Sequence, residues 1–142
     1  MNQALILWPL LVQVLLVLVL FIRLGTVKDR ARAAGAIDPL ATALDNDAWP
    51  NDVRQVANNM RNQFQVPVIF FVLVLALFAL GAADLIALVV AWLFVALRIV
   101  HSYIHIGSNY VPNRTRVFKL SVLCTLVLAA LLARALFHAT LG

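Results

Sequence analysis

The fold is decided by the stretch VPVIFFVLVLALFALGAADLIALVVAWLFVAL, which occupies residues 66–97. The stretch is almost entirely apolar, and only the short segment from Gly81 to Asp84 interrupts it. Glycine commonly ends a helix, and aspartate is a preferred cap at the start of the next one. The stretch therefore predicts two consecutive helices joined by a tight turn.

Apolar runs on either side of this stretch predict two more helices. Residues 4–22 are broken only by Pro9 and Gln13, and Arg23 closes the run. A transmembrane helix needs about 20 mostly apolar residues, so we expect an all-α, integral membrane four-helix bundle that forms one domain. The expected helices cover about residues 4–23, 51–80, 85–106 and 113–138 of a domain spanning residues 1–142. The candidate caps of the second and fourth helices are Asn51 or Asp52 and Asn113.

The composition is typical of a membrane protein. Hydrophobic residues make up 64% of the 142 residues and charged residues only 12%, whereas about a quarter of an ordinary soluble domain is charged. Four spans and their connections leave no room for a soluble catalytic domain. A cleaved signal peptide is the alternative reading of residues 4–22, but no basic segment precedes this run and it exceeds the usual apolar core of such peptides.

The basic residues predict the orientation of the chain in the membrane. They give a net charge of +5, but they cluster at the ends of the apolar runs and form no stripe typical of nucleic-acid binding. All of the 11 basic residues except Arg134 fall on one side of the expected topology, and cytoplasmic loops carry the excess of lysine and arginine. We therefore expect residues 23–50 to form a cytoplasmic loop, residues 107–113 to be a cytoplasmic turn, and both termini to lie outside the cytoplasm.

Polar side chains gather on single faces of the second and third expected helices. On the second helix they recur at helical spacing as Arg54, Asn58, Arg61, Asn62 and Gln65. On the third helix the same spacing places Arg98, His101 and His105 on one face. Charged side chains at membrane depth are costly and are functional candidates. Asn58, Asn62 and Gln65 are also consistent with hydrogen bonds that merely hold helices together.

The two histidines, Cys124 and Arg114 need separate interpretation. No acidic or thiolate partner accompanies the two histidines, so we expect no metal or haem site. The single cysteine, Cys124, is expected to be a packing residue. Arg114 occupies the first turn of the last helix, where the helix dipole disfavours a cation. Because Thr115 and free backbone N–H groups lie beside it, Arg114 predicts an anion or thiolate site.

These motifs together resemble the MAPEG family, the membrane-associated proteins in eicosanoid and glutathione metabolism. The motifs are Arg61-Asn62-x-x-Gln65-x-Pro67, Arg98-x-x-His101-x-x-x-His105, and Arg114-Thr115 nine residues beyond His105. The resemblance covers about residues 54–136 and is nearest to the prostaglandin E synthase branch, in a bacterial-type member. It implies a homotrimer of four-helix protomers in a bacterial inner membrane, with glutathione as the cofactor, bound between neighbouring protomers near the cytoplasmic side.

The resemblance also implies roles for the motif residues. Arg114 would activate the thiol of glutathione, and Thr115 would donate a hydrogen bond beside it. Asn62 would hold the tripeptide. The implied cofactor-binding residues are Arg61, Asn62, Gln65, Arg98, His101 and His105.

The chain departs from the family pattern at Asn58, Gln65 and His105, where the family has arginine, glutamate and tyrosine. Gln65 cannot pair with the ammonium of glutathione as a carboxylate does, and the chain contains no glutamate. Two functions are therefore expected as alternatives. One is a glutathione-dependent transferase or peroxidase that acts on lipophilic electrophiles from the bilayer. The other is a non-catalytic lipid-binding or scaffold subunit that serves a partner in a membrane complex.

Overall fold

The computed structural model describes residues 2–141, and within that range it is helical with no strand. The helices in chain order are η1 (Gln3–Ile6), α1 (Leu7–Ala33), α2 (Pro39–Leu44), η2 (Asn46–Ala48), α3 (Asn51–Asn62), α4 (Val66–Ala79), α5 (Leu85–Ile106) and α6 (Val111–Leu141). Four helical stretches are long and apolar enough to cross a membrane: Gln3–Ala33, Asn51–Ala79, Leu85–Ile106 and Val111–Leu141. The expected four-helix membrane architecture is confirmed.

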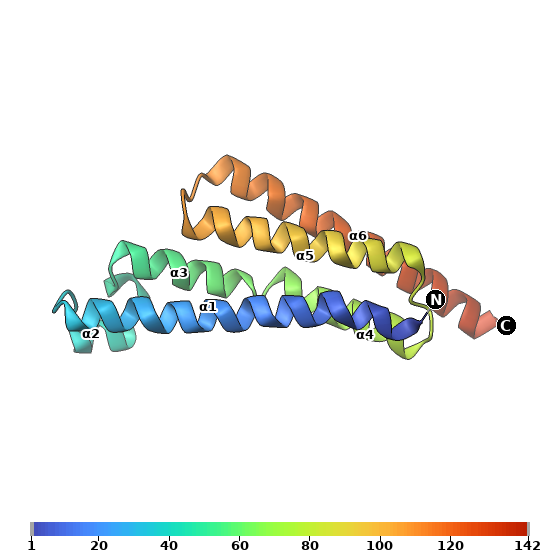
Figure 1. The fold of residues 1–142 in the computed structure, drawn as a ribbon, viewed down its shortest axis with the longest axis horizontal. Helices are drawn as coiled ribbons and strands as arrows, with labels where there is room; N and C mark the ends of the chain where they lie inside the picture. The colour runs from blue at the N-terminus through green and yellow to red at the C-terminus, as the bar shows by residue number, and fades with distance from the viewer. Residues whose placement is uncertain (1, 142) are drawn as a thin grey trace.

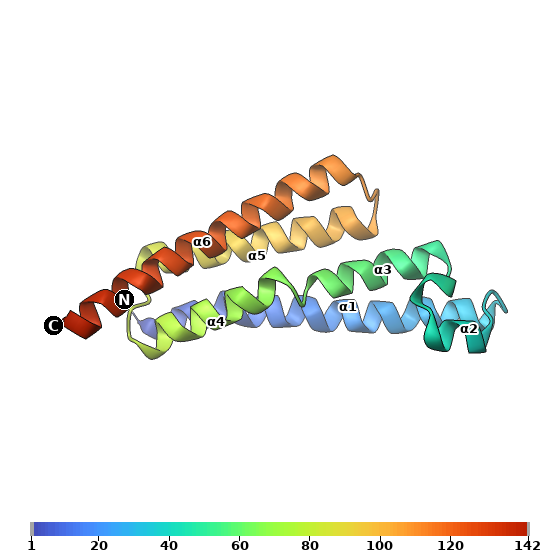
Figure 2. The ribbon, with the colours of Figure 1, turned by 180° about the vertical axis from the view of Figure 1, so that it is seen from behind.

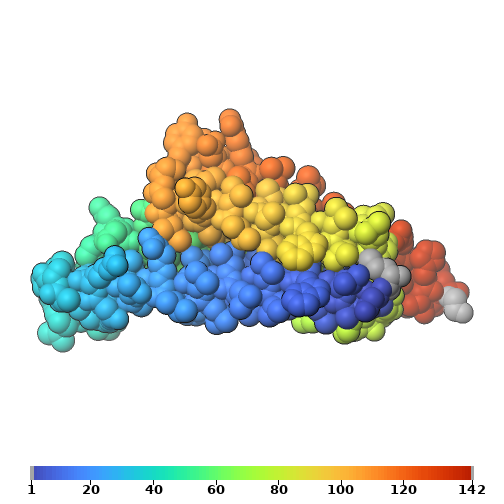
Figure 3. Space-filling view, viewed as in Figure 1, coloured from blue at the N-terminus to red at the C-terminus, as the bar shows by residue number. Residues whose placement is uncertain are grey.

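The long helices lie side by side along one axis (Figure 1). Both termini are at one end of the bundle, and α2 and the start of α3 are at the other end, as the rear view also shows (Figure 2). α6 packs on α5 and α4, while α1 packs on α3, α4 and α5. In the space-filling view α1 runs along the front with α5 seated on it, and the residues around the α5–α6 turn rise above the rest of the surface (Figure 3).

Two apolar clusters hold these helices together. The larger cluster lies toward the termini, where the rings of Phe70 in α4 and Phe94 in α5 stack with their centroids 4.2 Å apart. The smaller cluster lies at the opposite end and packs α1 against α3 around Trp49. Lys28 and Arg32 of α1 lie over the Trp49 ring, at 4.7 and 5.4 Å from its centroid, so the basic end of α1 is anchored as well as solvated.

α1 is longer than the sequence predicted. We expected a helix over about residues 4–23 and a loop over residues 23–50, but α1 continues to Ala33. Gly25 costs a helix only about 1 kcal/mol, and the basic residues that follow it are good helix formers. Arg30 and Arg32 also complement the negative C-terminal end of the helix. The predicted boundary was therefore wrong because a change in polarity was taken for the end of the helix.

The second membrane span is interrupted near its middle. We expected one helix over residues 51–80, but α3 ends at Asn62 and α4 begins at Val66. Pro67 accounts for the interruption, because its nitrogen has no hydrogen to donate to the carbonyl four residues earlier and its ring disfavours a helical residue before it. Gln65 adopts a non-helical conformation with φ −106° and ψ −103°. The last carbonyl groups of α3 are thereby left open to other donors.

The structure also tests the predicted caps. Asp84 caps α5 as expected, and its carboxylate accepts a hydrogen bond from the Ala87 N–H at 2.8 Å. Gly81 has φ +64°, which glycine adopts without strain. The other caps were wrong. Pro50 precedes α3 without any side-chain cap, and α6 begins at Val111 and ends at Leu141, so Asn113 lies inside that helix.

Candidate functional site

A polar cavity of about 200 Å³ lies where the interruption between α3 and α4 faces α5 and the first turns of α6. Its lining residues are Asn62, Gln65, His101, Arg114, Thr115 and Phe118. All of them except Phe118 were singled out from the sequence. Three motifs that are distant along the chain thus meet at one cavity.

Arg114 enters this cavity from the start of α6 and is held by neutral partners. Its Nη1 donates to Oδ1 of Asn109 at 2.6 Å and to Nε2 of His105 at 3.3 Å. Asn109 has φ 51°, a left-handed conformation that asparagine tolerates better than most residues. No carboxylate of the described residues forms an ion pair with Arg114. The guanidinium therefore keeps an uncompensated positive charge beside the cavity.

The contacts of the two histidines assign their neutral tautomers. A guanidinium can only donate, so Nε2 of His105 accepts from Arg114 and its proton resides on Nδ1. A carbonyl oxygen can only accept, so Nδ1 of His101 donates to the Arg114 carbonyl at 3.3 Å. Nε2 of His101 is then an acceptor that is buried and unpartnered among the described residues. The site thus offers a cation together with a hydrogen-bond acceptor.

Arg98 lies behind the cavity rather than on its wall. Its side chain is fully buried, and Nη2 donates to the carbonyl oxygen of Asn62 at 3.1 Å. That carbonyl belongs to the last turn of α3, so Arg98 caps a helix end inside the bundle. Nε and Nη1 of Arg98 have no partner among residues 2–141. The geometry suits a residue that fixes Asn62, and a direct contact between Arg98 and a ligand stays a prediction.

A chain of buried polar side chains crosses the same interruption. Nε2 of Gln63 donates to Oγ of Ser102 at 3.1 Å, and Nε2 of Gln13 donates to Oε1 of Gln63 at 3.1 Å. Asn59 is buried beside Gln63. Such hydrogen bonds link helices inside membrane bundles. From the sequence, Gln13 stood out only as an interruption of an apolar run, and Asn59, Gln63 and Ser102 were not predicted. Asn59 and Gln63 follow the buried Val56 by three and seven residues, which places them on one helical face next to the predicted stripe.

The predicted stripe on the second helix is divided by the interruption. Asn62 and Gln65 reach the cavity, but Asn58 and Arg61 are exposed on α3 and do not line it. Arg54 lies near the start of α3, farther from the cavity, and pairs with Asp47 at 2.8 Å. Within one chain Arg61 therefore has no part in the cavity, and its predicted role toward glutathione stays a prediction.

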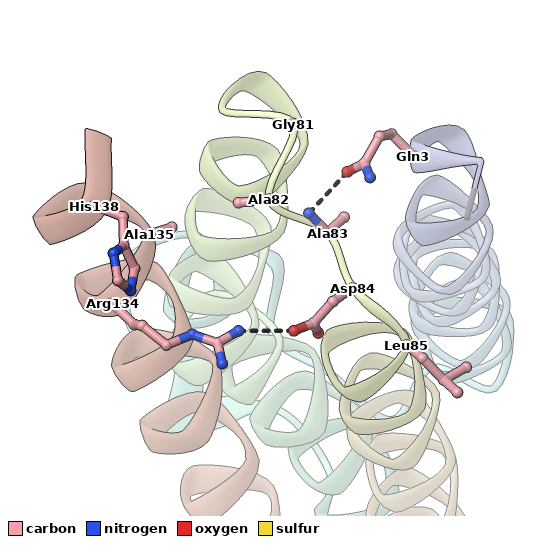
Figure 4. Close-up of a pocket in the computed structure, with 9 residues that line it drawn as sticks. All are labelled: Gln3, Gly81, Ala82, Ala83, Asp84, Leu85, Arg134, Ala135 and His138. Carbon is pink, nitrogen blue, oxygen red and sulfur yellow. Dashed lines mark hydrogen bonds and ion pairs between the residues drawn. The ribbon is translucent and has the colours of Figure 1, made fainter. Parts of the chain in front are cut away.

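The opposite end of the bundle holds a cavity of about 440 Å³ next to the termini (Figure 4). Arg134 of α6 pairs with the Asp84 carboxylate at 2.8 Å, and the Gln3 side chain accepts from the Ala83 N–H at 2.8 Å. The hydrogen bond from Ala87 and the nearby Arg134 hold the pKa of the Asp84 carboxyl below its ordinary value of 3.8. Arg134 and Asp84 neutralise one another. Their ion pair therefore links α6 to the start of α5 and does not form a second candidate site.

No metal or haem site was expected from the sequence. Among residues 2–141 no three His, Cys, Asp or Glu side chains gather into a ligand set. Cys124 is buried in the larger apolar cluster, where it packs as a small residue.

The same region of the chain matches a known family. The profile of the MAPEG family matches residues 6–134, which include every residue of the candidate site. The chain belongs to the MAPEG family. Together with the four apolar spans, this makes it an integral, multi-pass membrane protein. MAPEG members include glutathione transferases and related membrane proteins. Neither a curated protein nor a solved structure matches this MAPEG chain.

Proposed function

We propose that this MAPEG protein is a membrane-embedded, glutathione-dependent transferase or peroxidase that acts on lipophilic electrophiles. The observation that carries the proposal is that the Arg114 guanidinium faces a polar cavity, and that no carboxylate of residues 2–141 pairs with it. A cation beside a thiol favours its deprotonated form, which is the nucleophile. Thr115 lines the same cavity and supplies a hydroxyl donor.

The residues present fit most of the groups of glutathione. Its two carboxylates and its peptide oxygens need donors, which the amides of Asn62 and Gln65 and the guanidinium of Arg114 provide. Its peptide N–H groups need acceptors, and Nε2 of His101 is a buried acceptor without a partner among the described residues. Its ammonium would meet an amide oxygen in place of a carboxylate. Glutathione would supply the thiol, while these side chains bind it and favour its negative charge.

The rest of the site is proposed to come from neighbouring copies of the chain. Pockets for small molecules usually measure about 300–1,000 Å³, and the cavity in one chain measures about 200 Å³. Asn58 and Arg61 are exposed on α3 and are free to face a second copy. We therefore propose a homotrimer in which neighbouring protomers complete the cavity, with Arg61 contributing from the surface of α3.

The proposed topology places this site near the cytoplasmic face of a bacterial inner membrane. The site lies toward the end of the bundle that carries all the basic residues but Arg134, and the termini lie together at the other end (Figure 1). Positive residues favour the cytoplasmic side, so both termini would lie outside the cytoplasm. Phe118 gives the cavity an apolar wall for a substrate from the bilayer, and its ring centroid lies 5.9 Å from that of His101.

One observation favours a second candidate function. Gln65 lines the cavity where a carboxylate would hold the ammonium of glutathione, and no glutamate elsewhere in the chain can replace it. Weak binding of the tripeptide would leave a membrane-facing polar cavity without turnover. The alternative is therefore a lipid-binding or scaffold subunit on the same fold, which serves a partner enzyme.

Turnover of a model lipophilic electrophile with glutathione tests the proposal. Wild-type protein should convert the electrophile. Arg114→Lys should lose most of this activity, because a compact ammonium cannot reproduce the geometry of the guanidinium donors. Arg116→Lys is the matched control, since Arg116 is exposed on the same turn and lines no part of the cavity. If wild type is inactive, or if both variants lose activity equally, the enzyme proposal fails and the scaffold function replaces it.

A further inference from the structure

A further cavity, mostly apolar but lined by Arg23, reaches the surface of the bundle between α1 and the end of α5, and it measures about 490 Å³. The residues that line it are Arg23, Tyr103, Ile104, Ile106, Gly107 and Ser108. None of them lines the cavity around Arg114. The cavity therefore needs an explanation of its own, independent of the proposed chemistry.

Arg23 forms no ion pair with any described residue. One explanation for its position is that it caps α5, whose C-terminus carries partial negative charge. Three of the last four carbonyl groups of α5 are already occupied, however. Those of Tyr103 and Ile104 accept from N–H groups of the following turn at 3.0 and 2.8 Å. The carbonyl of His105 accepts from the Gln55 side chain at 2.6 Å. α5 is thus capped without Arg23, whose donors remain available to a ligand.

The cavity lies at the boundary between the apolar and polar parts of the two helices. Arg23 directly follows Ile22, which is 71% exposed at the end of the apolar run of α1. Tyr103 is 80% exposed and lies one turn beyond Val100 on the same face of α5. Basic and tyrosine side chains at the ends of apolar runs occupy the depth of lipid headgroups. The exposed apolar side chains beside them lie at the depth of the acyl chains.

We propose that this cavity binds the phosphate headgroup of an anionic phospholipid. Arg23 holds the phosphate, the Tyr103 hydroxyl donates a hydrogen bond to it, and an acyl chain lies along the exposed apolar side chains around Ile22 and Val100. Basic pockets between transmembrane helices are known sites for anionic headgroups, and anionic leaflets attract basic residues next to the membrane. The cavity lies at the end of the bundle where the positive charge is concentrated, which matches this ligand in sign.

The test is binding of a short-chain phosphatidylglycerol to the purified protein in mild detergent, followed by native mass spectrometry. Phosphatidylcholine of the same chain length and soluble glycerol phosphate are the comparison ligands. Arg23→Gln should weaken phosphatidylglycerol binding by at least about tenfold, the loss expected for one charge-assisted contact. Tyr103→Leu should weaken it less. The matched control is Arg30→Gln, because Arg30 is exposed on the same helix, forms no ion pair and lies outside the cavity.

Several results would overturn this inference. Equal binding of phosphatidylglycerol and phosphatidylcholine would remove the role of charge, and tight binding of glycerol phosphate would identify a soluble ligand instead. An equal effect of Arg30→Gln would show general attraction and no site. The same spectra report the mass of the assembly, so a loss of subunits in Arg23→Gln would mean that a second copy of the chain occupies the cavity.

Discussion

Asn109 should matter for activity although it does not line the candidate cavity. Its side chain accepts the hydrogen bond at 2.6 Å that holds the Arg114 guanidinium. Asn109→Gly removes this acceptor and keeps the left-handed backbone at φ 51°, which glycine adopts without strain. A hydrogen bond to a charged group contributes about 1.5–3 kcal/mol. We therefore expect kcat/KM with glutathione to fall by about tenfold to a hundredfold.

The same substitution should leave the fold intact. Glycine relieves the strain of a left-handed residue but adds about 0.4–1 kcal/mol of unfolded-state entropy, so the backbone contributions nearly cancel. The assay compares kcat/KM and thermal unfolding for wild type, Asn109→Gly and Asn109→Asp, which restores an acceptor but brings a carboxylate to the Arg114 guanidinium. Activity should fall in the glycine variant and stay low in the aspartate variant, because the new carboxylate neutralises the charge that favours the thiolate. Unchanged activity in Asn109→Gly, in a protein that Arg114→Lys inactivates, would refute the role given to Asn109.

Three further predictions follow from other contacts. Gln65→Glu should tighten glutathione binding by about tenfold to a hundredfold in calorimetry, because a carboxylate can pair with the ammonium; no change would mean that Gln65 does not meet that group. The hydrogen bond from the Ala87 N–H and the Arg134 guanidinium hold the pKa of Asp84 below 3.8, so the ionised carboxylate stabilises the fold above that pH, and this stabilisation is lost as the pH falls through the lower, folded-state pKa. In Asp84→Asn the unfolding temperature should therefore fall less steeply below pH 3.8 than in wild type. An unchanged dependence of the unfolding temperature on pH would contradict the stabilising role of the Asp84 carboxylate. Gln13→Leu and Gln63→Leu should each destabilise the protein by about 1–3 kcal/mol in denaturant unfolding, and the double variant by less than their sum, because each single change leaves a buried partner unpaired.

Much of the fold could be predicted because apolar runs of transmembrane length have few alternatives in a bilayer. The turn at Gly81 and the cap at Asp84 were found for a different reason, because each residue type has a specific backbone preference. The boundaries of the other helices were harder. α1 continues to Ala33 through basic residues that favour helix as much as they favour water, so polarity alone did not mark its end.

The candidate site was found only in part, because helical spacing assumes a continuous helix. Pro67 interrupts the second span, and beyond α3 the spacing no longer reports which side chains share a face. The interruption brings Asn62 and Gln65 to the cavity and leaves Arg61 exposed. Asn109 was missed because its contact with Arg114 depends on a left-handed turn residue that no periodic pattern reports.

The most direct test of the proposed site is the structure of the protein determined with glutathione in a lipid environment. The proposed function predicts three copies around an axis, with density for the tripeptide in the cavity formed by Asn62, Gln65 and Arg114, and with its sulfur beside the Arg114 guanidinium. Density for the tripeptide elsewhere, or a cavity filled by lipid while glutathione is saturating, would contradict it.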